Sequence, residues 1–301
     1  MNATSLIIPT PPHFSFWSTV YSHGWSDLRP FEIDKELETL NLTLRLSPKR
    51  FASLTLSPLQ RGIQTTVIAS ALLSSDDKWK IRSVVADCFR LNEELEPFYT
   101  IAKKVPSFRW ALKKGAGRMI RSASVFEDVV KMICTTNCSW SLTKSMTSNL
   151  VIGLGEDWNG TRTFPTPEAL ARVSEKFVRK EIRAGYRSPF LLEFAERVAT
   201  GALEVESWRT APLTTEELFK RLRGIKGVGE YAAGNLLRLL GHYDAMAFDS
   251  WVRAEYYKKH RQGRRVLDRT IEKHYAPYGP WRGLFFWLDM TESWFEKRHP
   301  F

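Results

Sequence analysis

The segment from 215 to 240 constrains the fold of this chain more than any other stretch. It reads TEELFKRLRGIKGVGEYAAGNLLRLL, with Gly-Val-Gly at 227–229 between two halves that each show helical periodicity. Glycine adopts positive φ and lets two backbones approach closely. The pattern therefore predicts a helix, a tight turn and a second helix. These helices would pack through Leu218, Leu222, Ile225, Ala232, Ala233, Leu236 and Leu237.

The turn of this hairpin is a candidate anion site. We expect the second helix to begin at about Gly229 or Glu230, which leaves its first N–H groups free and pointing outward. Such a helix terminus binds phosphate without reading a base sequence. The same tripeptide would also suit an ordinary interhelical turn. The residues expected at the phosphate are Gly224, Lys226, Gly227, Val228 and Gly229.

The charge of the chain indicates a polyanionic partner. Its 44 Lys and Arg exceed its 33 Asp and Glu, for a net charge of +11. Basic residues gather in the segments 103–121 and 253–265. Clusters of this kind suit the phosphate backbone of nucleic acid. Nucleic acid is favoured over an anionic membrane surface as the partner, and the apolar runs are far shorter than a membrane span, so we expect no membrane.

The pattern along the chain predicts an α+β fold with two domains. Residues 1–90 read as an N-terminal antiparallel β domain, with a loose arm at 1–12, strands from Phe14 onward and a helix at 76–91. Residues 91–301 read as an all-helical core that contains the hairpin at 215–240 and a long helical segment at 124–155. The helical part could be two intermingled subdomains, because the sequence shows no clean break within it.

A lone carboxylate follows the hairpin. Asp249 lies in the apolar stretch AMAFDSW, just before a segment that reads as a helix. Asp is a favoured N-cap residue, so this position has a structural explanation as well as a catalytic one.

The cysteines do not predict a cofactor. Cys88, Cys134 and Cys138 are too few for a four-cysteine cluster, and the last two lie four residues apart on an expected helix. We therefore expect no metal and no iron–sulfur cluster. The N-terminus lacks the basic and apolar regions of a signal peptide. The expected location is the cytoplasm (nucleoid) of a prokaryote or the nucleus of a eukaryote.

The hairpin together with the carboxylate resembles the helix-hairpin-helix (HhH-GPD) DNA glycosylases of base excision repair. The similar branch contains 3-methyladenine DNA glycosylase II and 8-oxoguanine glycosylase. LRGIKGVGEYAAGNLL and the following AMAFDSWVR carry the resemblance. Four more segments resemble the family's N-terminal domain and core helices: FSFWSTVYSHGWSDLRPF, VFEDVVKMICTTNCSWSLT, AGYRSPFLLEFAERV and YAPYGPWRGLFFW.

This resemblance implies a catalytic role for Asp249. Family members carry an Asp about twenty residues after the last hairpin glycine, and Asp249 lies twenty residues after Gly229. A carboxylate there would stabilise positive charge on the sugar and orient or activate a water molecule. Bifunctional members have a Lys where this chain has Tyr231, and Tyr cannot form a Schiff base. The resemblance therefore implies a monofunctional enzyme, with Lys226 on the wrong side of the turn for catalysis.

The resemblance also assigns residues to base flipping. Asn137 matches a residue that fills the gap in the duplex, Tyr186 matches an aromatic wedge, and Arg187 matches an Arg that contacts the orphaned base. Their alternatives are a helix-capping Asn, a packed Tyr and a surface Arg. Of the 11 Trp residues, we expect Trp140 and Trp251 to line the base pocket, with Tyr231 either there or simply packed.

The function that follows is removal of a damaged base from double-stranded DNA by a monomer that requires no cofactor. Alkylated purines are the favoured substrates. The alternatives are an 8-oxoguanine-type glycosylase with or without lyase activity, and a DNA-binding module that lacks catalysis. By resemblance, the hairpin carbonyls could also hold a monovalent cation.

Overall fold

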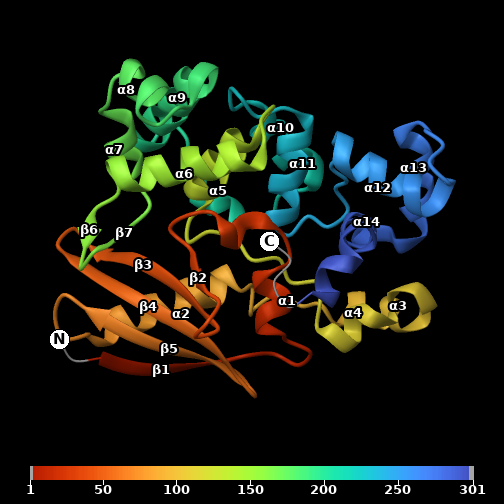
Figure 1. Cartoon of the computed structure of the whole chain (residues 1–301), viewed down its shortest axis with the longest axis horizontal. Coiled ribbons are helices and arrows are strands. Elements are labelled where there is room, and N and C mark those ends of the chain that lie inside the picture. The colour runs from red at the N-terminus through yellow and green to blue at the C-terminus, as the bar shows by residue number, and fades with distance from the viewer. Residues whose placement is uncertain (1–2, 298–301) are drawn as a thin grey trace.

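The structure is a computed structural model that describes residues 3–297. An antiparallel sheet lies on one side of the molecule and helices fill the other side (Figure 1). The sheet has the strand order β1-β5-β4-β3-β2. Its strands are β1 Ala3–Pro9, β2 Glu32–Asp34, β3 Thr39–Ser47, β4 Arg50–Leu59 and β5 Gly62–Ala69. The α+β prediction is therefore confirmed.

Apolar residues at alternate positions set the register of the sheet. Leu42 of β3 lies opposite Leu54 of β4, which in turn lies opposite Val67 of β5. All three side chains are buried, because side chains alternate between the two faces of a strand. Helix α2 Ser75–Cys88 packs on the sheet, and the predicted helix at 76–91 is confirmed. The side chains of Ser74 and Asp77 form a capping box at its start.

Two details of the predicted β domain are wrong. The expected arm at 1–12 contains the edge strand β1, which pairs with β5 along its whole length and buries Leu6 and Ile8. The next segment is not strand either. Helix α1 Phe16–Val20 and the 3-10 helix η1 Gly24–Asp27 precede β2. Their aromatic side chains pack under the sheet, and this tertiary packing outweighs local β propensity.

The second part of the chain is almost wholly helical. Its helices are α3 Glu96–Lys104, α4 Arg109–Lys114, α5 Val125–Thr135, α6 Trp140–Leu154, α7 Pro167–Ala171, α8 Glu175–Lys180, α9 Ser188–Ala199, α10 Thr215–Arg223, α11 Glu230–Leu239, α12 Ser250–Arg261, α13 Asp268–Tyr275 and α14 Arg282–Thr291. The 3-10 helices are η2 Pro106–Phe108, η3 Gly185–Arg187, η4 Glu206–Arg209, η5 Ala276–Trp281 and η6 Glu292–Glu296. A short ribbon, β6 Asp157–Trp158 and β7 Thr161–Arg162, also lies here, so this part is not strictly all-helical.

The long helical segment expected at 124–155 is broken in two. Helix α5 ends at Thr135, and α6 starts at Trp140 with Ser139 as its N-cap. Between them Asn137 has φ +47, a left-handed conformation that interrupts a helix. Cys134 and Cys138 therefore do not share a helix, contrary to the prediction.

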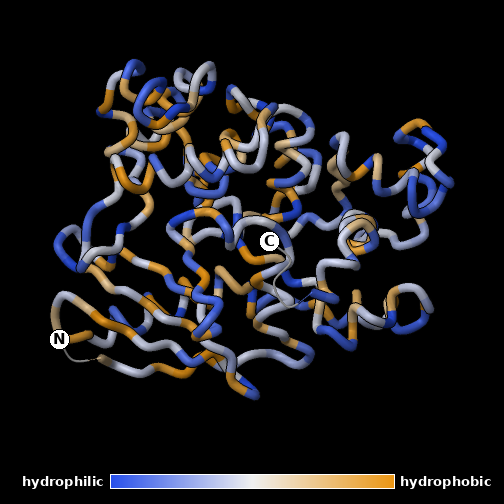
Figure 2. Tube along the Cα trace, in the orientation of Figure 1, coloured by the Kyte–Doolittle hydropathy of each residue, from blue (hydrophilic) through white to orange (hydrophobic). Residues whose placement is uncertain are grey.

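Two clusters of buried apolar residues meet near the hairpin. The first joins the sheet to helices α5 to α11 and continues across residue 90, where the sequence suggests a domain boundary. The second joins α3 and α4 to α12, α13 and α14, so the first helices of the helical part pack against the last ones (Figure 1). Figure 2 shows hydrophobic residues along the strands and inner helices, with hydrophilic residues on many outer turns. The loop between α11 and α12 crosses from one cluster to the other.

Candidate functional site

The predicted hairpin is present, with Gly227 at its tightest point. Gly227 has φ +87, and a Cβ there would lie 2.9 Å from the Phe190 ring. Gly229 is the N-cap of α11 with φ −79, so this second glycine does not use the positive φ that glycine allows. A Cβ at Gly229 would meet only the Arg223 side chain, at 3.8 Å. The backbone of Gly229 is therefore ordinary, and its lack of a side chain leaves the N-terminus of α11 uncovered.

Two side chains define the charge around the turn. Lys226 is exposed and forms an ion pair with Glu193 at 2.6 Å. The Arg223 guanidinium donates to the Val228 carbonyl oxygen at 3.0 Å. That hydrogen bond occupies a hairpin carbonyl and places a positive charge beside it. The monovalent cation that the resemblance suggests for the other hairpin carbonyls stays a prediction.

In both basic clusters, some of the side chains form hydrogen bonds or ion pairs within the fold. Arg118 is buried, and its guanidinium donates to a backbone carbonyl. In the second cluster Arg253 pairs with Asp268 at 2.7 Å, and Lys259 pairs with Asp289 at 2.8 Å. The charge available to a polyanion is therefore smaller than the two sequence clusters suggest.

A cavity of about 780 Å³ lies beside the hairpin helix. This volume is in the range of cavities that bind a small molecule or a single base. Met119 and five segments line it: 23–25, 132–143, 231–239, 247–252 and 287–294. It thus lies at the junction of the two apolar clusters, and residues from both ends of the chain meet in it.

Asp249 lines this cavity and is partly exposed. It is also the N-cap of α12, because its Oδ1 accepts a hydrogen bond from the Val252 N–H at 2.7 Å. The structural explanation of this residue is therefore correct. It does not exclude chemistry, since a cap fixes the carboxylate in place and a helix N-terminus attracts negative charge.

Tyr231 is close to Asp249 on the cavity wall. Burial, followed by the negative charge of Asp249, raises the pKa of the Tyr231 hydroxyl to about 12. The phenol is therefore protonated at neutral pH and can act only as a neutral group beside the carboxylate.

The two predicted tryptophans both line the cavity. Trp140 and Trp251 are each 38% exposed, which leaves part of each ring open to a ligand. The Trp140 Nε1–H donates to Asp27 at 3.0 Å, and its ring lies so close to Gly24 that a Cβ there would clash at 2.4 Å. The Trp251 ring lies 5.4 Å from that of Trp294.

The three residues assigned to base flipping are neighbours, but only one lines the cavity. Asn137 does so, and its amide donates to the Tyr186 hydroxyl at 3.4 Å. Tyr186 is 48% exposed. Arg187 is buried rather than on the surface, donates to the Thr136 carbonyl and stacks on the Tyr186 ring at 4.5 Å. Arg187 therefore supports the aromatic ring, and an outward contact would require it to leave Thr136.

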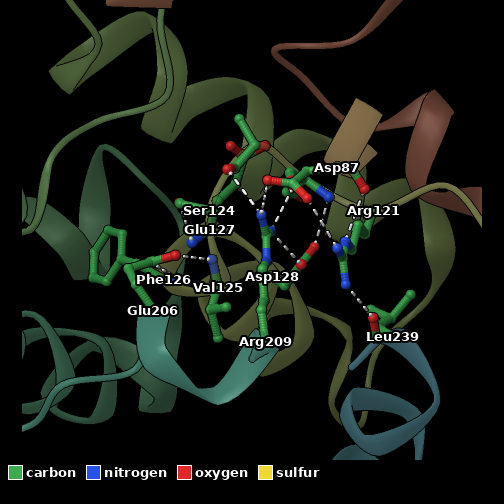
Figure 3. A network of polar contacts seen from close by, with 12 residues as sticks. Asp87, Arg121, Ser124, Val125, Phe126, Glu127, Asp128, Glu206, Arg209 and Leu239 are labelled. Atoms are coloured by element: carbon green, nitrogen blue, oxygen red, sulfur yellow. Dashed lines mark hydrogen bonds and ion pairs between the residues drawn. The ribbon is translucent and has the colours of Figure 1, made fainter. Parts of the chain in front are cut away.

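Sequence reasoning missed several residues of the cavity. Trp25 is held by its Nε1–H, which donates to the Asp128 carboxylate at 2.8 Å. Asp128 belongs to the polar network of Figure 3, where Arg121 also reaches the Leu239 carbonyl. This network ties the end of α2 to α5 and α11. No local pattern could have revealed a contact between residues 103 positions apart.

Arg238 is another cavity residue that sequence reasoning missed. It lies on α11, three positions after Asn235 and seven after Tyr231, so all three polar residues share one face of the helix. It is 3% exposed and lies 4.3 Å from the centre of the Trp287 ring. Burial lowers the pKa of Arg238 to about 10, which still leaves it charged at neutral pH. The spacing of these three polar residues along α11 is a signal in the sequence that could have identified Arg238.

Known proteins share this fold. No family model matches the chain. It is 25% identical over 169 residues to the DNA-3-methyladenine glycosylase of Bacillus subtilis, covering 54% of the chain and 55% of that protein. The 8-oxoguanine glycosylase/lyase of Clostridium acetobutylicum has a TM-score of 0.73 at 18% identity, with 95% of each chain covered. The 3-methyladenine DNA glycosylase of Archaeoglobus fulgidus has a TM-score of 0.69 at 18% identity, with 98% and 99% covered.

These matches extend over different lengths. The chain spans little more than half of the first curated relatives that it matches, at 55% and 60% of their lengths. The solved structures, by contrast, match along nearly the whole chain and share both the sheet and the helices. The chain therefore has the fold of these DNA glycosylases, and it carries the hairpin and the following carboxylate within that fold.

Proposed function

We propose that this protein is a monofunctional DNA glycosylase that hydrolyses the N-glycosidic bond of a flipped-out damaged base in duplex DNA. The observation that carries the proposal is Asp249. Its carboxylate is fixed by the α12 cap at the wall of a cavity of about 780 Å³ beside the hairpin. A fixed negative charge next to an enclosed base is what bond cleavage at the sugar requires.

The reaction follows from this placement. The bond between the sugar C1′ and the base nitrogen breaks, and its electron pair leaves with the base. The Asp249 carboxylate stabilises the positive charge that develops on the sugar. It also orients a water molecule, whose oxygen bonds to C1′ and whose proton passes to the carboxylate. The products are the free base and an abasic site.

DNA binding is assigned to the hairpin. The free N–H groups at the start of α11 form an anion site, and Gly229 leaves it uncovered. We propose that Asn137 and Tyr186, which are hydrogen-bonded to each other, fill the gap that the flipped base leaves. We propose duplex DNA as the partner and a single chain as the acting unit, in the nucleoid or the nucleus where DNA lies.

Tyr231 supports the monofunctional assignment. It lies on the cavity wall beside Asp249, where a nucleophilic Lys would be needed for a Schiff base. Lys226 does not line the cavity and is paired with Glu193. We therefore propose no lyase step and no cofactor. The similar enzyme of Clostridium acetobutylicum is described as a glycosylase/lyase, so the two would differ in this step.

Alkylated purines are the proposed substrates. The similar proteins of Bacillus subtilis and Archaeoglobus fulgidus are named 3-methyladenine glycosylases. The cavity has indole walls, including Trp140 and Trp251, on which a purine can stack. A second candidate is 8-oxoguanine, which is favoured by the TM-score of 0.73 to an 8-oxoguanine glycosylase/lyase.

The test is a panel of duplex oligonucleotides, each with one lesion, incubated with wild type and with Asp249→Asn. Asn is also a good N-cap, so this variant should keep α12 intact. We expect strand cleavage that depends on hot alkali, occurs for a subset of lesions and is lost in the variant while DNA binding remains. Cleavage without alkali, or a borohydride-trapped adduct, would contradict the monofunctional assignment. Binding without excision of any lesion would leave only a DNA-binding protein.

A further inference from the structure

Arg238, a buried cation at the inner end of the cavity, forms no ion pair with an acidic side chain of residues 3–297, although the negative charge of Asp249 acts to raise its pKa. Two nitrogens of Arg238, Nε and Nη1, are shielded and make no hydrogen bond to residues 3–297, and Nη2 donates to the amide oxygen of Asn235. A buried charge without a counter-ion is costly for a fold. Such a charge in a ligand cavity points to a role toward the ligand.

The cavity has a clear direction from its mouth to its inner end. Asp249 is partly exposed and is followed by the exposed Ser250 and Trp251. Arg238 and His23 are only 3% and 6% exposed. If the sugar of a flipped nucleotide is placed at Asp249, its base extends inward, toward Arg238. The negative charge thus faces the sugar and the positive charge faces the base.

His23 does not add a second charge to this end. Burial, followed by the nearby charge of Arg238, lowers the pKa of His23 to about 3, so its ring is neutral. Its Nδ1 accepts a hydrogen bond from the Trp25 N–H at 3.1 Å. The aromatic hydroxyls nearby are neutral too, because burial raises the pKa of both Tyr231 and Tyr243. The inner end therefore carries the single charge of Arg238 among these groups.

This charge distinguishes two kinds of damaged base. An uncharged base receives the electron pair of the broken bond and becomes an anion unless it is protonated. A purine alkylated at N3 or N7 is already a cation in the nucleotide, and it leaves as a neutral molecule. A fixed positive charge stabilises the first kind of transition state and repels the second kind of substrate.

We propose that Arg238 is a specificity-determining residue that makes this cavity selective for uncharged damaged bases over cationic ones. This inference rests on the proposed function and narrows its substrate class. Among alkylated purines it favours uncharged ones, such as 1,N6-ethenoadenine, over 3-methyladenine and 7-methylguanine. In the balanced step, the electron pair passes to the base nitrogen, Arg238 stabilises that negative charge, and solvent protonates the released base.

The first experiment uses the wild-type protein. Single-turnover excision is measured for ethenoadenine, hypoxanthine, 8-oxoguanine, 3-methyladenine and 7-methylguanine in the same duplex. Each rate is divided by the spontaneous loss of that base, because cationic bases leave more easily without an enzyme. We expect the largest rate enhancement for an uncharged base. A larger enhancement for both cationic bases would overturn the inference and leave the glycosylase assignment intact. No excision of any base would overturn both.

The second experiment uses Arg238→Met and Arg238→Lys. We expect Arg238→Met to reduce excision of the preferred uncharged base by about 10-fold or more, with little loss or a gain for 7-methylguanine. Arg238→Lys keeps the charge and should keep most of the preference. The matched control is Arg118→Met, because Arg118 is equally buried and does not line the cavity.

A merely structural role for Arg238 would lower excision of both kinds of base equally, as we expect for Arg118→Met. An unchanged ratio of uncharged to cationic excision in Arg238→Met would therefore contradict the proposal. If that variant does not fold, the ratio in Arg238→Lys and the wild-type rate enhancements decide the question.

Discussion

Lys131 and Arg238 are both buried cations, but the protein treats them in opposite ways. Lys131 has no exposed side-chain surface and forms an ion pair with Glu127 at 2.7 Å. Its ammonium group also donates to the Leu28 carbonyl and lies over the Phe31 ring. Arg238 is nearly as buried, yet its contacts are an amide oxygen and the Trp287 ring. Lys131 joins two parts of the fold, whereas Arg238 faces a cavity.

Burial alone does not separate a structural charge from a functional one. The partner and the position together do, since Arg118 is buried with a backbone carbonyl as its partner and does not line the cavity. A paired buried charge is compensated inside the fold, so removing its partner strongly lowers the free energy of unfolding. A charge without a counter-ion keeps its interaction available for a ligand. Asp249 is the matching case at the mouth of the cavity, with one oxygen used for capping and the carboxylate partly exposed.

The largest expected effect is on the paired charge. Glu127→Leu leaves Lys131 buried without a counter-ion, which should lower the free energy of unfolding by about 3–5 kcal/mol. Urea denaturation measures this change. The control is the double variant Glu127→Leu with Lys131→Met, which should recover most of the loss. A single variant as stable as wild type would show that Lys131 does not need its partner.

The next effect is on catalysis. Asp249→Asn should cost about 2.7–4 kcal/mol of transition-state stabilisation, a loss of about 10²–10³-fold in single-turnover rate. Its stability should stay close to wild type, because Asn also caps a helix. Asp249→Ala removes the cap as well and should lower the free energy of unfolding by about 1 kcal/mol. Equal rates for wild type and Asp249→Asn would make this carboxylate structural, like Glu127.

A smaller effect concerns how the free energy of unfolding depends on pH through His23, which lies near Arg238. The pKa of His23 is about 3 in the folded protein and 6.5 when unperturbed. Between these values the unfolded state binds the extra proton, so stability is full above pH 6.5 and is lost as pH falls. The slope from this group is about 1.4 kcal/mol per pH unit at most.

Urea denaturation at several pH values measures this slope. His23→Asn should make it shallower. Arg238→Met should raise the pKa of His23 in the folded protein, because the charge of Arg238 helps to keep His23 neutral, so the loss of stability should level off at a higher pH and be smaller in total. A slope that neither variant changes would mean that Arg238 and His23 are not coupled.

The smallest expected effect is the stability of Arg238→Met. Because this variant removes a buried charge that has no counter-ion, its free energy of unfolding should change by less than about 1 kcal/mol or increase. Thermal and urea unfolding measure the difference. A loss as large as that of Glu127→Leu would show that Arg238 is structural, and the contrast between the two cations would disappear.

Particular residues show how far sequence reasoning reached. The hairpin, the start of α11 and the alternating strands of the sheet followed from periodicity and turn chemistry, which act over a few residues. The edge strand β1 did not, because its hydrogen bonds come from β5, about sixty residues away along the chain. The break at Asn137 was missed because the apolar residues farther out on both sides read as one helix, although Asn137 itself adopts a left-handed conformation between polar neighbours.

The sequence by itself determined the local elements: two helices around Gly227, a capped helix after Asp249 and a sheet with one apolar face. Tertiary structure alone decided what these elements enclose. It placed Trp25 against Asp128, gave Lys131 a counter-ion and left Arg238 without one in the same cavity as Asp249. The physical reason is that burial and the pairing of charges depend on segments far apart in the chain, whereas helix periods and caps depend on near neighbours.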